Sequence, residues 1–238
     1  MLLAGLIVGA LAAACRPAGG ASGIPSTSPS GLPASSGAEP ALRYVALGDS
    51  YTIGTSVAAA ERWPDQLVAA LGRPPGLEIA ANLAVNGYTS GDVIQHELPQ
   101  LDALRPEFAS LLIGVNDVVQ GVPAARFESN AAAILDDLRA RLPADRIVVV
   151  ATPDYTVTPQ GAGYGEPAAQ AAGIIENNRI LERLAKARGI AWVDIHDLSL
   201  LAAGDRSLVA SDGLHPSGAQ YALWVERILP VVERLLVR

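Results

Sequence analysis

A serine, a histidine and an aspartate of this 238-residue chain have the types and spacing that nucleophilic catalysis at a carbonyl requires. Ser50 follows a short apolar run, where a strand would turn into a helix and leave the hydroxyl exposed. His215 comes directly before Pro216, which biases its backbone towards an extended conformation at the mouth of the final helix. Asp212, three residues earlier, is close enough to hold one ring nitrogen of His215 while the other faces Ser50. We interpret the three residues as nucleophile, base and orienting acid.

Two further residues offer N–H groups to a developing oxyanion. Asn116 has a side-chain amide, and Gly87 has a backbone N–H that no side chain obstructs. Simpler structural interpretations stay open, since Asn116 and Asp117 are typical of an Asx turn and Gly87 can serve only to provide a positive φ. Ser50 can likewise be the N-cap of the helix that follows it. We expect Asp117 to be structural, and Asn86 beside Gly87 allows a one-residue shift in that assignment.

The other two histidines compete with His215 for the role of base. His96 lies in a predicted helix and is expected to be solvated, and its surroundings lack the second histidine of a zinc-protease motif. His196 follows a strand and could reach the site, but no aspartate precedes it by three residues. Asp194 and Asp197 flank His196 and are expected to serve the turn. We therefore prefer His215 as the base.

Five apolar runs predict the strands that must position these residues: 43–47, 77–83, 108–115, 146–151 and 190–195. The runs are continuous rather than alternating, which is typical of strands buried on both faces of a parallel sheet. Apolar residues at helical spacing between them predict connecting helices. Pro99 is expected to kink or end one of these, and Pro216 to lie in the first turn of the last. The pattern predicts an α/β fold, a three-layer α/β/α sandwich with a five-stranded parallel sheet and right-handed crossovers.

Ligands of such sheets bind beyond the carboxyl ends of the strands, where all the candidate residues fall. Asp49, beside the candidate nucleophile, is expected to stabilise the turn. The irregular segment 152–167 follows the fourth strand and carries Tyr155 and Tyr164. Because long ordered loops tend to be functional, we expect this segment to border the acyl or alcohol pocket; the alternative is a mobile surface loop.

Four blocks in this order resemble the SGNH/GDSL hydrolase family, over the chain from Leu42 to its C-terminus. They are Gly48-Asp49-Ser50 with Gly54, the turn at Gly87, Gly114-Val115-Asn116-Asp117, and Asp212-Gly213-Leu214-His215-Pro216. The resemblance implies a flavodoxin-like SGNH fold and the catalytic triad Ser50, Asp212 and His215. It also implies an oxyanion hole made by the Ser50 N–H, Gly87 and Asn116, with no metal and no organic cofactor.

The resemblance further implies a serine esterase or acylhydrolase that cleaves carboxylic esters, with short acyl or lipid groups, through an acyl-enzyme on Ser50. Two alternatives stay open. One is an O-acyltransferase that passes the same acyl group to a glycan or lipid acceptor. The other is a non-catalytic surface module that binds glycans or lipids, for which the intact set of residues would have no use.

Composition limits the remaining function classes. Hydrophobic residues make up 50% of the chain, too many for a disordered protein. The formal net charge of -7 argues against nucleic acid and against docking on anionic lipid. A single cysteine excludes a disulfide framework within the chain, and with three histidines it argues against a multi-ligand metal site. We expect a monomer whose partner is a small-molecule, glycan or lipid ester substrate.

The first 40 residues differ from the rest. Residues 1–14 form an apolar run too short to span a bilayer but suited to a secretory signal. The run ends in Ala12-Ala13-Ala14-Cys15, which resembles a bacterial lipobox, although no basic residue precedes it. We predict a signal peptide over 1–15, a flexible linker rich in Pro, Ser, Gly and Ala over 16–40, and the hydrolase domain over 41–238. The protein is then exported and lipid-anchored through Cys15; the alternatives are a plain cleaved signal and a poorly ordered terminus.

Overall fold

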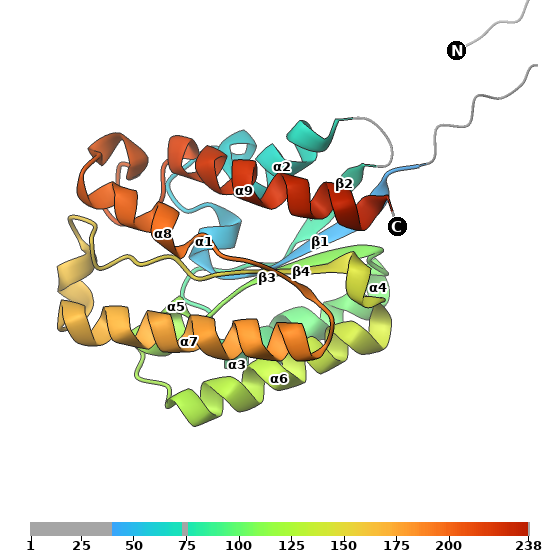
Figure 1. The fold of residues 1–238 in the computed structure, drawn as a ribbon, viewed down its shortest axis with the longest axis horizontal. Helices are drawn as coiled ribbons and strands as arrows, with labels where there is room; N and C mark the ends of the chain where they lie inside the picture. The colour runs from blue at the N-terminus through green and yellow to red at the C-terminus, as the bar shows by residue number, and fades with distance from the viewer. Residues whose placement is uncertain (1–39, 73–75, 238) are drawn as a thin grey trace, which may run out of the picture. The chain divides into compact units, whose positions relative to one another are not determined.

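The computed structural model describes residues 40–72 and 76–237, so the predicted signal, including Cys15, and most of the linker lie outside the described residues. Five strands form one parallel sheet, as the sequence predicts, and their order is β2-β1-β3-β4-β5 (Figure 1). Their bounds are β1 (Leu42–Gly48), β2 (Leu77–Asn82), β3 (Phe108–Leu112), β4 (Ile147–Val150) and β5 (Ala191–Val193). The chain steps outward from β1 to β2 and then returns to the other side of β1. That reversal creates the switch point at which α/β sheets bind ligands.

Helices cover both faces of the sheet (Figure 1). The helices α2 (Trp63–Leu71) and α9 (Gly218–Leu236) lie on one face, and α6 (Ala124–Arg141) and α7 (Pro167–Ala187) lie on the other. The side chains of strand β1 show why helices must cover both faces of the sheet. Tyr44 and Ala46 belong to the apolar cluster beneath α2 and α9, whereas Val45 and Leu47 belong to the cluster beneath α6 and α7. Alternate residues of one continuous apolar run thus enter two different cores.

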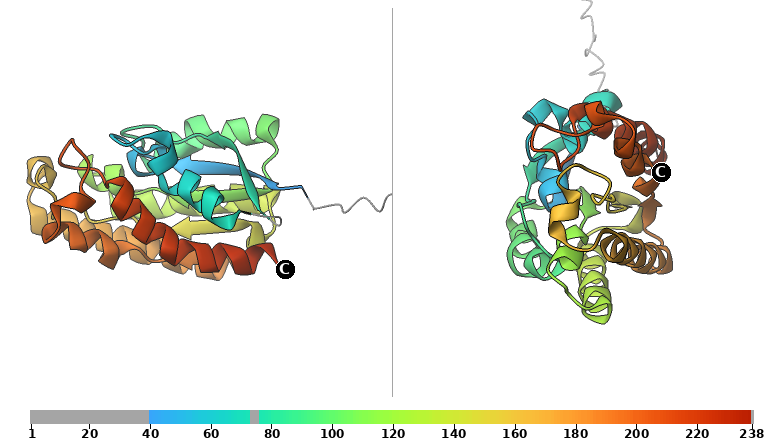
Figure 2. Two further views of the ribbon diagram at one scale, coloured as in Figure 1. Left: turned by 90° about the horizontal axis from the view of Figure 1, so that it is seen from above. Right: turned by 90° about the vertical axis from the view of Figure 1, so that its left-hand side faces the viewer.

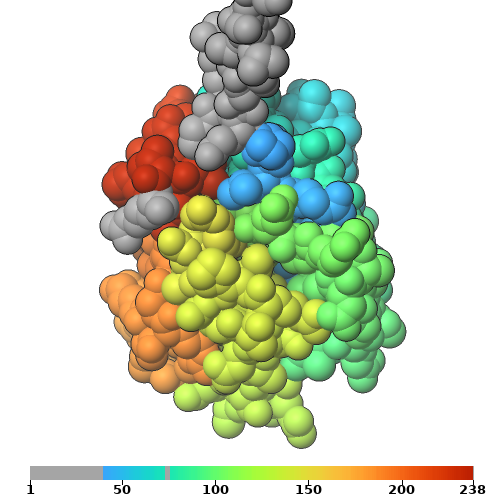
Figure 3. Space-filling model, turned by 90° about the vertical axis from the view of Figure 1, so that its right-hand side faces the viewer, coloured from blue at the N-terminus to red at the C-terminus, as the bar shows by residue number. Residues whose placement is uncertain are grey.

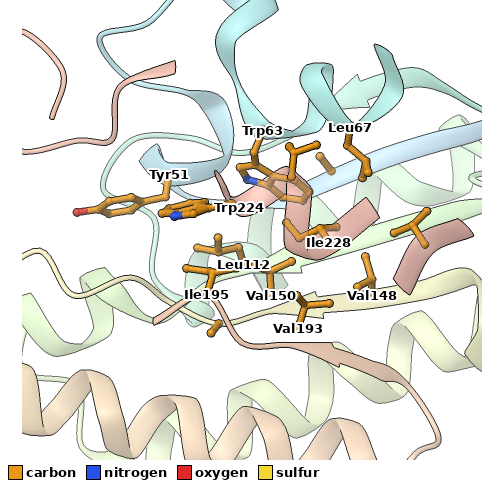
Figure 4. Close-up of a cluster of buried hydrophobic side chains, with 14 of the residues drawn as sticks. Tyr51, Trp63, Leu67, Leu112, Val148, Val150, Val193, Ile195, Trp224 and Ile228 are labelled. Atoms are coloured by element: carbon orange, nitrogen blue, oxygen red, sulfur yellow. The ribbon is translucent and has the colours of Figure 1, made fainter. Parts of the chain in front are cut away.

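The core beneath α2 and α9 contains the two largest fully buried side chains, Trp63 and Trp224 (Figure 4). Both indoles lie over sheet residues such as Leu112 and Val150, and Tyr51 lies at the edge of the same cluster. Tyr51 directly follows the candidate nucleophile, so this core anchors the segment that carries Ser50. Burying a large apolar side chain contributes about 1.5–3 kcal/mol.

Several predicted boundaries differ from those of the structure by one or two residues, and two larger differences lie next to candidate site residues. The third strand ends at Leu112 rather than at residue 115, because Gly114 at φ 131° turns the chain and Val115 begins the short helix α5 (Val115–Val119). A side chain at Gly114 would approach the Phe127 ring to 3.0 Å, so the turn also depends on the missing Cβ. Pro216 does not lie in the first turn of α9. Ser217 is the N-cap, and its side chain accepts a hydrogen bond from the Gln220 N–H.

The helix predicted around residues 93–101 is broken into four turns. They are α3 (Ser90–Asp92), a π-helical turn (Val93–Glu97), a 3₁₀ turn (Leu98–Gln100) and α4 (Leu101–Leu104). Pro99 lies in the 3₁₀ turn, where its missing N–H breaks the regular helix, as expected. His96 is exposed, as predicted, whereas its neighbour Glu97 is buried.

Different segments of the chain lie at the two ends of the sheet. At the carboxyl end, short helices and loops follow each strand, including α1 (Ser50–Ile53) and α8 (His196–Ser199) (Figure 2, right). At the other end, the start of β1, the turn before β4 and the last turn of α9 lie side by side (Figure 3). Arg146 fastens this end by donating to the Leu235 carbonyl at 2.7 Å. Within residues 40–72 and 76–237, no helix has the length and apolar character needed to cross a membrane.

Candidate active site

The candidate nucleophile lies at a tightly constrained junction between β1 and α1. Gly48 has φ 149°, and a Cβ there would lie 2.2 Å from the Leu112 carbonyl oxygen of the adjacent strand. Asp49 then caps α1, its Oδ1 accepting the Tyr51 N–H at 3.0 Å, which confirms its expected role in the turn. Ser50 is therefore the first residue of the helix and not its N-cap, so the structural alternative for Ser50 is wrong. Its own N–H, at the start of a helix, has no intrahelical acceptor.

Ser50 is only 6% exposed, yet its hydroxyl faces a cavity. Within residues 40–72 and 76–237, the hydroxyl has no hydrogen-bond partner. The cavity has a volume of about 220 Å³, and His215, Gly87 and Asn116 line it together with Ser50. The structure thus brings four of the five predicted site residues to one cavity. The fifth, Asp212, lies behind His215.

Asp212 and His215 form a closed turn that fixes the imidazole. His215 Nδ1 lies 2.6 Å from Asp212 Oδ2, and Asp212 Oδ1 accepts the backbone N–H groups of Leu214 and His215 at 2.9 and 3.0 Å. Partial burial acts to raise the pKa of Asp212, but the Leu214 N–H and the other donors outweigh it and lower the pKa to about 2. An ionised carboxylate only accepts hydrogen bonds, so His215 Nδ1 is the donor in this contact.

One further donor to Asp212 was not predicted. Ser56 Oγ donates to Asp212 Oδ2 at 2.7 Å from the loop that follows α1. A serine in a loop gives no sequence signal for such a contact, because the partner is 156 residues away in the chain.

The two predicted oxyanion donors come from the Gly87 turn and from helix α5, and hydrogen bonds join these two segments. Gly87 has φ 83°, and its carbonyl oxygen accepts from Gln120 Nε2 at 2.9 Å. Asn116, in α5, donates one Nδ2 hydrogen to the Tyr88 carbonyl at 3.0 Å. An amide nitrogen has two hydrogens, so one remains for a ligand. No acceptor for the Gly87 N–H lies among the described residues, and Asn116 and Gly87 both line the cavity.

Asp117 has the structural role predicted for it. Its carboxylate is buried and accepts the Ser90 N–H at 2.9 Å and the Ser90 hydroxyl at 2.5 Å. These bonds join α5, which carries Asn116, to the start of α3, which follows the Gly87 turn. The distance between the two candidate oxyanion donors is therefore set by buried contacts rather than by the loops alone.

The segment 152–167 lies against the cavity, and its two tyrosines line it. The Tyr155 ring is buried, and its hydroxyl donates to Gln170 of α7. Tyr164 is 44% exposed and packs edge-on against Tyr155 with ring centroids 5.9 Å apart. With Tyr51, Val115, Val119 and Leu214 they make most of the cavity wall apolar.

The rival histidines do not lie in this cavity. His196 lines a separate depression with Trp192 and Asp194, and its Nε2 is 3.9 Å from Asp154 Oδ2. The exposed His96 packs on the Tyr88 ring at a centroid distance of 5.6 Å. Across the residues that the structure describes, no group of three His, Cys, Asp or Glu side chains could hold a metal ion.

The sequence does not predict that Asp49 and Glu97 form a buried pair of acids near Ser50. Glu97 Oε2 accepts the Gly48 N–H at 2.9 Å, and both Glu97 and Asp49 are fully buried. Burial, reinforced by the charge of Asp117, raises the pKa of Asp49 to about 8. Burial, reinforced by the charge of Asp49, raises the pKa of Glu97 to about 9. The sequence gives no signal for this contact, because Gly48 is 49 residues away from Glu97 in the chain.

Comparison with known proteins gives one family and one fold. A family model described as GDSL-like Lipase/Acylhydrolase family matches residues 46–223. Among solved structures, an acetylxylan esterase from Geobacillus stearothermophilus is 17% identical and covers 80% of this chain and 94% of its own, with a TM-score of 0.64. A lipolytic protein of the G-D-S-L family from Veillonella parvula is 17% identical and covers 81% and 98%, with a TM-score of 0.65. At such identities the structural likeness shows the fold. The comparison with curated proteins finds no match.

Proposed function

The chain belongs to the GDSL-like lipase/acylhydrolase family, and we propose that this ester-cleaving hydrolase works through an acyl-enzyme formed on Ser50. One observation carries the proposal. His215, whose Nδ1 lies 2.6 Å from Asp212 Oδ2, lines the same cavity as Ser50. A serine and a histidine that a carboxylate orients are the groups that hydroxyl attack on an ester requires.

The proposed reaction has two halves. The Ser50 oxygen attacks the ester carbonyl while His215 Nε2 takes its proton, and the tetrahedral oxyanion accepts hydrogen bonds from the Ser50 N–H, the Gly87 N–H and Asn116 Nδ2. His215 then gives the proton to the departing alkoxide, which leaves as the alcohol. Water, deprotonated by His215, attacks the acyl-enzyme, and Ser50 regains its proton as the carboxylic acid leaves. Asp212 stays ionised and stabilises the imidazolium in both halves.

The size and lining of the cavity favour short acyl groups. A space of about 220 Å³ with walls of tyrosine, valine and leucine suits a small apolar acyl chain better than a long lipid. The fold likeness to an acetylxylan esterase points to the same class of small acyl group. We therefore propose acetyl and other short-chain esters as substrates.

The decisive experiment compares wild-type, Ser50→Ala and His215→Ala proteins on p-nitrophenyl acetate, with circular dichroism to verify folding. Loss of kcat by about 10⁴ or more in both variants is expected, since the two residues act as one unit. A fluorophosphonate probe should label wild-type protein and leave Ser50→Ala unlabelled. Wild-type turnover by folded Ser50→Ala protein would overturn the proposal. Product analysis with and without a xylo-oligosaccharide acceptor separates hydrolysis from acyl transfer.

We further propose that the enzyme is exported and held at the bacterial membrane by a lipid on Cys15. The support is the sequence of the N-terminal segment alone. Metabolic labelling with a fatty-acid analogue should tag the full-length chain and fail to tag Cys15→Ser. Labelling of both chains, or of neither, would contradict lipidation at Cys15.

A further inference from the structure

Ser56 adopts a backbone conformation that a serine seldom takes without a reason. Its φ is 66°, and in the described ranges only one other non-glycine residue, Arg105, has a positive φ. Holding a residue with a Cβ in this region costs about 1–2 kcal/mol. Such strain persists where the surrounding structure needs the side chain in one place, and it clusters at functional sites.

This backbone conformation places the Ser56 hydroxyl beside Asp212, the predicted catalytic aspartate. Ser56 Oγ donates to Asp212 Oδ2 at 2.7 Å, and that same oxygen lies 2.6 Å from His215 Nδ1. Asp212 Oδ1 is already occupied by two backbone N–H groups. A carboxylate has about four acceptor sites, so the four donors hold both oxygens in fixed positions. Ser56 is the one donor of the four that does not come from the turn 212–215.

The loop that carries Ser56 also connects the other parts of the site. The Thr55 N–H donates to the Ser50 carbonyl at 3.1 Å, and Thr55 Oγ1 donates to Asn86 Oδ1 at 2.6 Å, next to Gly87. Residues 55 and 56 thus contact the nucleophile segment, the oxyanion turn and the Asp212–His215 turn. A change of position in any one of these would be transmitted through this pair.

We propose that Ser56 is a positioning residue, which fixes Asp212 Oδ2 and thereby the orientation of the His215 imidazole toward Ser50. The inference rests on the proposed triad. Ser56 does not touch the reacting atoms; it acts through Asp212. Because the hydrogen bond is accessible to solvent, water partly replaces the hydroxyl when it is removed, and the expected effect on kcat is moderate.

The test uses two variants that separate the hydroxyl from the backbone strain. Ser56→Gly removes the hydroxyl and relaxes φ, whereas Ser56→Ala removes the hydroxyl and keeps the strained Cβ. Both should lower kcat on p-nitrophenyl acetate about 3–10-fold, as loss of one charge-assisted bond permits, with KM within about twofold. Only Ser56→Gly should keep or raise the melting temperature. Ser207→Ala is the matched control, because Ser207 Oγ donates to Asp205 at 2.6 Å in a loop that does not line the cavity.

A double-mutant cycle decides whether Ser56 acts through Asp212. In an Asp212→Ala background, Ser56→Gly should change kcat by less than about twofold. Proton NMR provides a second readout, since the His215 Nδ1–H signal should move in Ser56→Gly and stay in Ser207→Ala. Equal losses in both backgrounds, or a Ser56→Gly enzyme with wild-type kcat and an unmoved signal, would overturn the inference. Active Ser50→Ala protein would instead overturn the proposed function, so the two failures are distinguishable.

Discussion

Two carboxylate sites border the candidate nucleophile, and the same chemical group behaves oppositely in them. Asp212 lies behind His215, and both of its carboxylate oxygens accept hydrogen bonds. Its pKa is lowered to about 2. Asp49 and Glu97 lie in the interior beneath Ser50, and their pKa values are raised to about 8 and about 9. Each of these two acids has one oxygen without a hydrogen-bond partner, Asp49 Oδ2 and Glu97 Oε1.

Hydrogen-bond donors and access to solvent, rather than closeness to the active site, therefore decide which carboxylate carries a charge. Four donors outweigh partial desolvation at Asp212, whereas full burial dominates at Asp49 and Glu97. At neutral pH, Asp212 is therefore ionised and able to stabilise an imidazolium, while the buried pair is largely protonated. Of these three acids, only Asp212 is largely ionised at neutral pH, and it is the one that contacts His215.

The largest effect expected from this comparison is on catalysis. Asp212→Asn removes the charge and places an amide beside His215 Nδ1, which favours the wrong tautomer. We expect kcat to fall about 10⁴-fold. Steady-state kinetics on p-nitrophenyl acetate measures the loss, and a melting temperature close to wild type verifies that the fold is intact. A loss below tenfold would show that the charge of Asp212 is not needed.

The second effect is on stability, and its sign follows from the raised pKa of Glu97. Glu97 ionises near its ordinary pKa of 4.5 in the unfolded chain and near 9 in the folded one, so the folded protein holds the proton more tightly. The contribution of this bound proton to the free energy of unfolding is complete below about pH 4.5 and is lost as the pH rises towards 9. Each proton contributes a slope of up to about 1.4 kcal/mol per pH unit.

Glu97→Gln tests this sign, because an amide oxygen can still accept the Gly48 N–H but cannot ionise. We expect the variant to unfold like wild type near pH 5 and at higher denaturant concentration than wild type at pH 8–9. Urea titrations at the two pH values give the free energy of unfolding. Parallel pH profiles of the two proteins would contradict protonation of Glu97 in the folded state.

Sequence patterns predict the sheet and the Asp212–His215 pair because both depend on local signals. Continuous apolar runs mark doubly buried strands, and the three-residue spacing of Asp212 and His215 is short enough for direct contact. The sequence does not predict the end of the third strand correctly, since Ile113 and Val115 continue the apolar run on either side of Gly114. There the backbone turn, set by a close approach to Phe127, overrides the hydrophobic pattern.

Ser56 and Glu97 could not be predicted for a different reason. The role of each depends on a contact between distant segments, Ser56 with Asp212 and Glu97 with Gly48, which only the folded sheet brings together. The strand order, with β1 between β2 and β3, is likewise a property of the whole fold.

The smallest effect is expected at Asp49, the acid next to the nucleophile in sequence. Asp49→Asn keeps an oxygen that can accept the Tyr51 N–H and mimics the protonated acid, so the N-cap of α1 is preserved. We expect kcat at pH 7 within about threefold of wild type, in contrast to the loss in Asp212→Asn, together with a higher melting temperature at pH 9. Kinetics and melting curves of both asparagine variants, measured side by side, test the contrast. A loss at Asp49→Asn as large as that at Asp212→Asn would mean that charge is needed on both sides of Ser50.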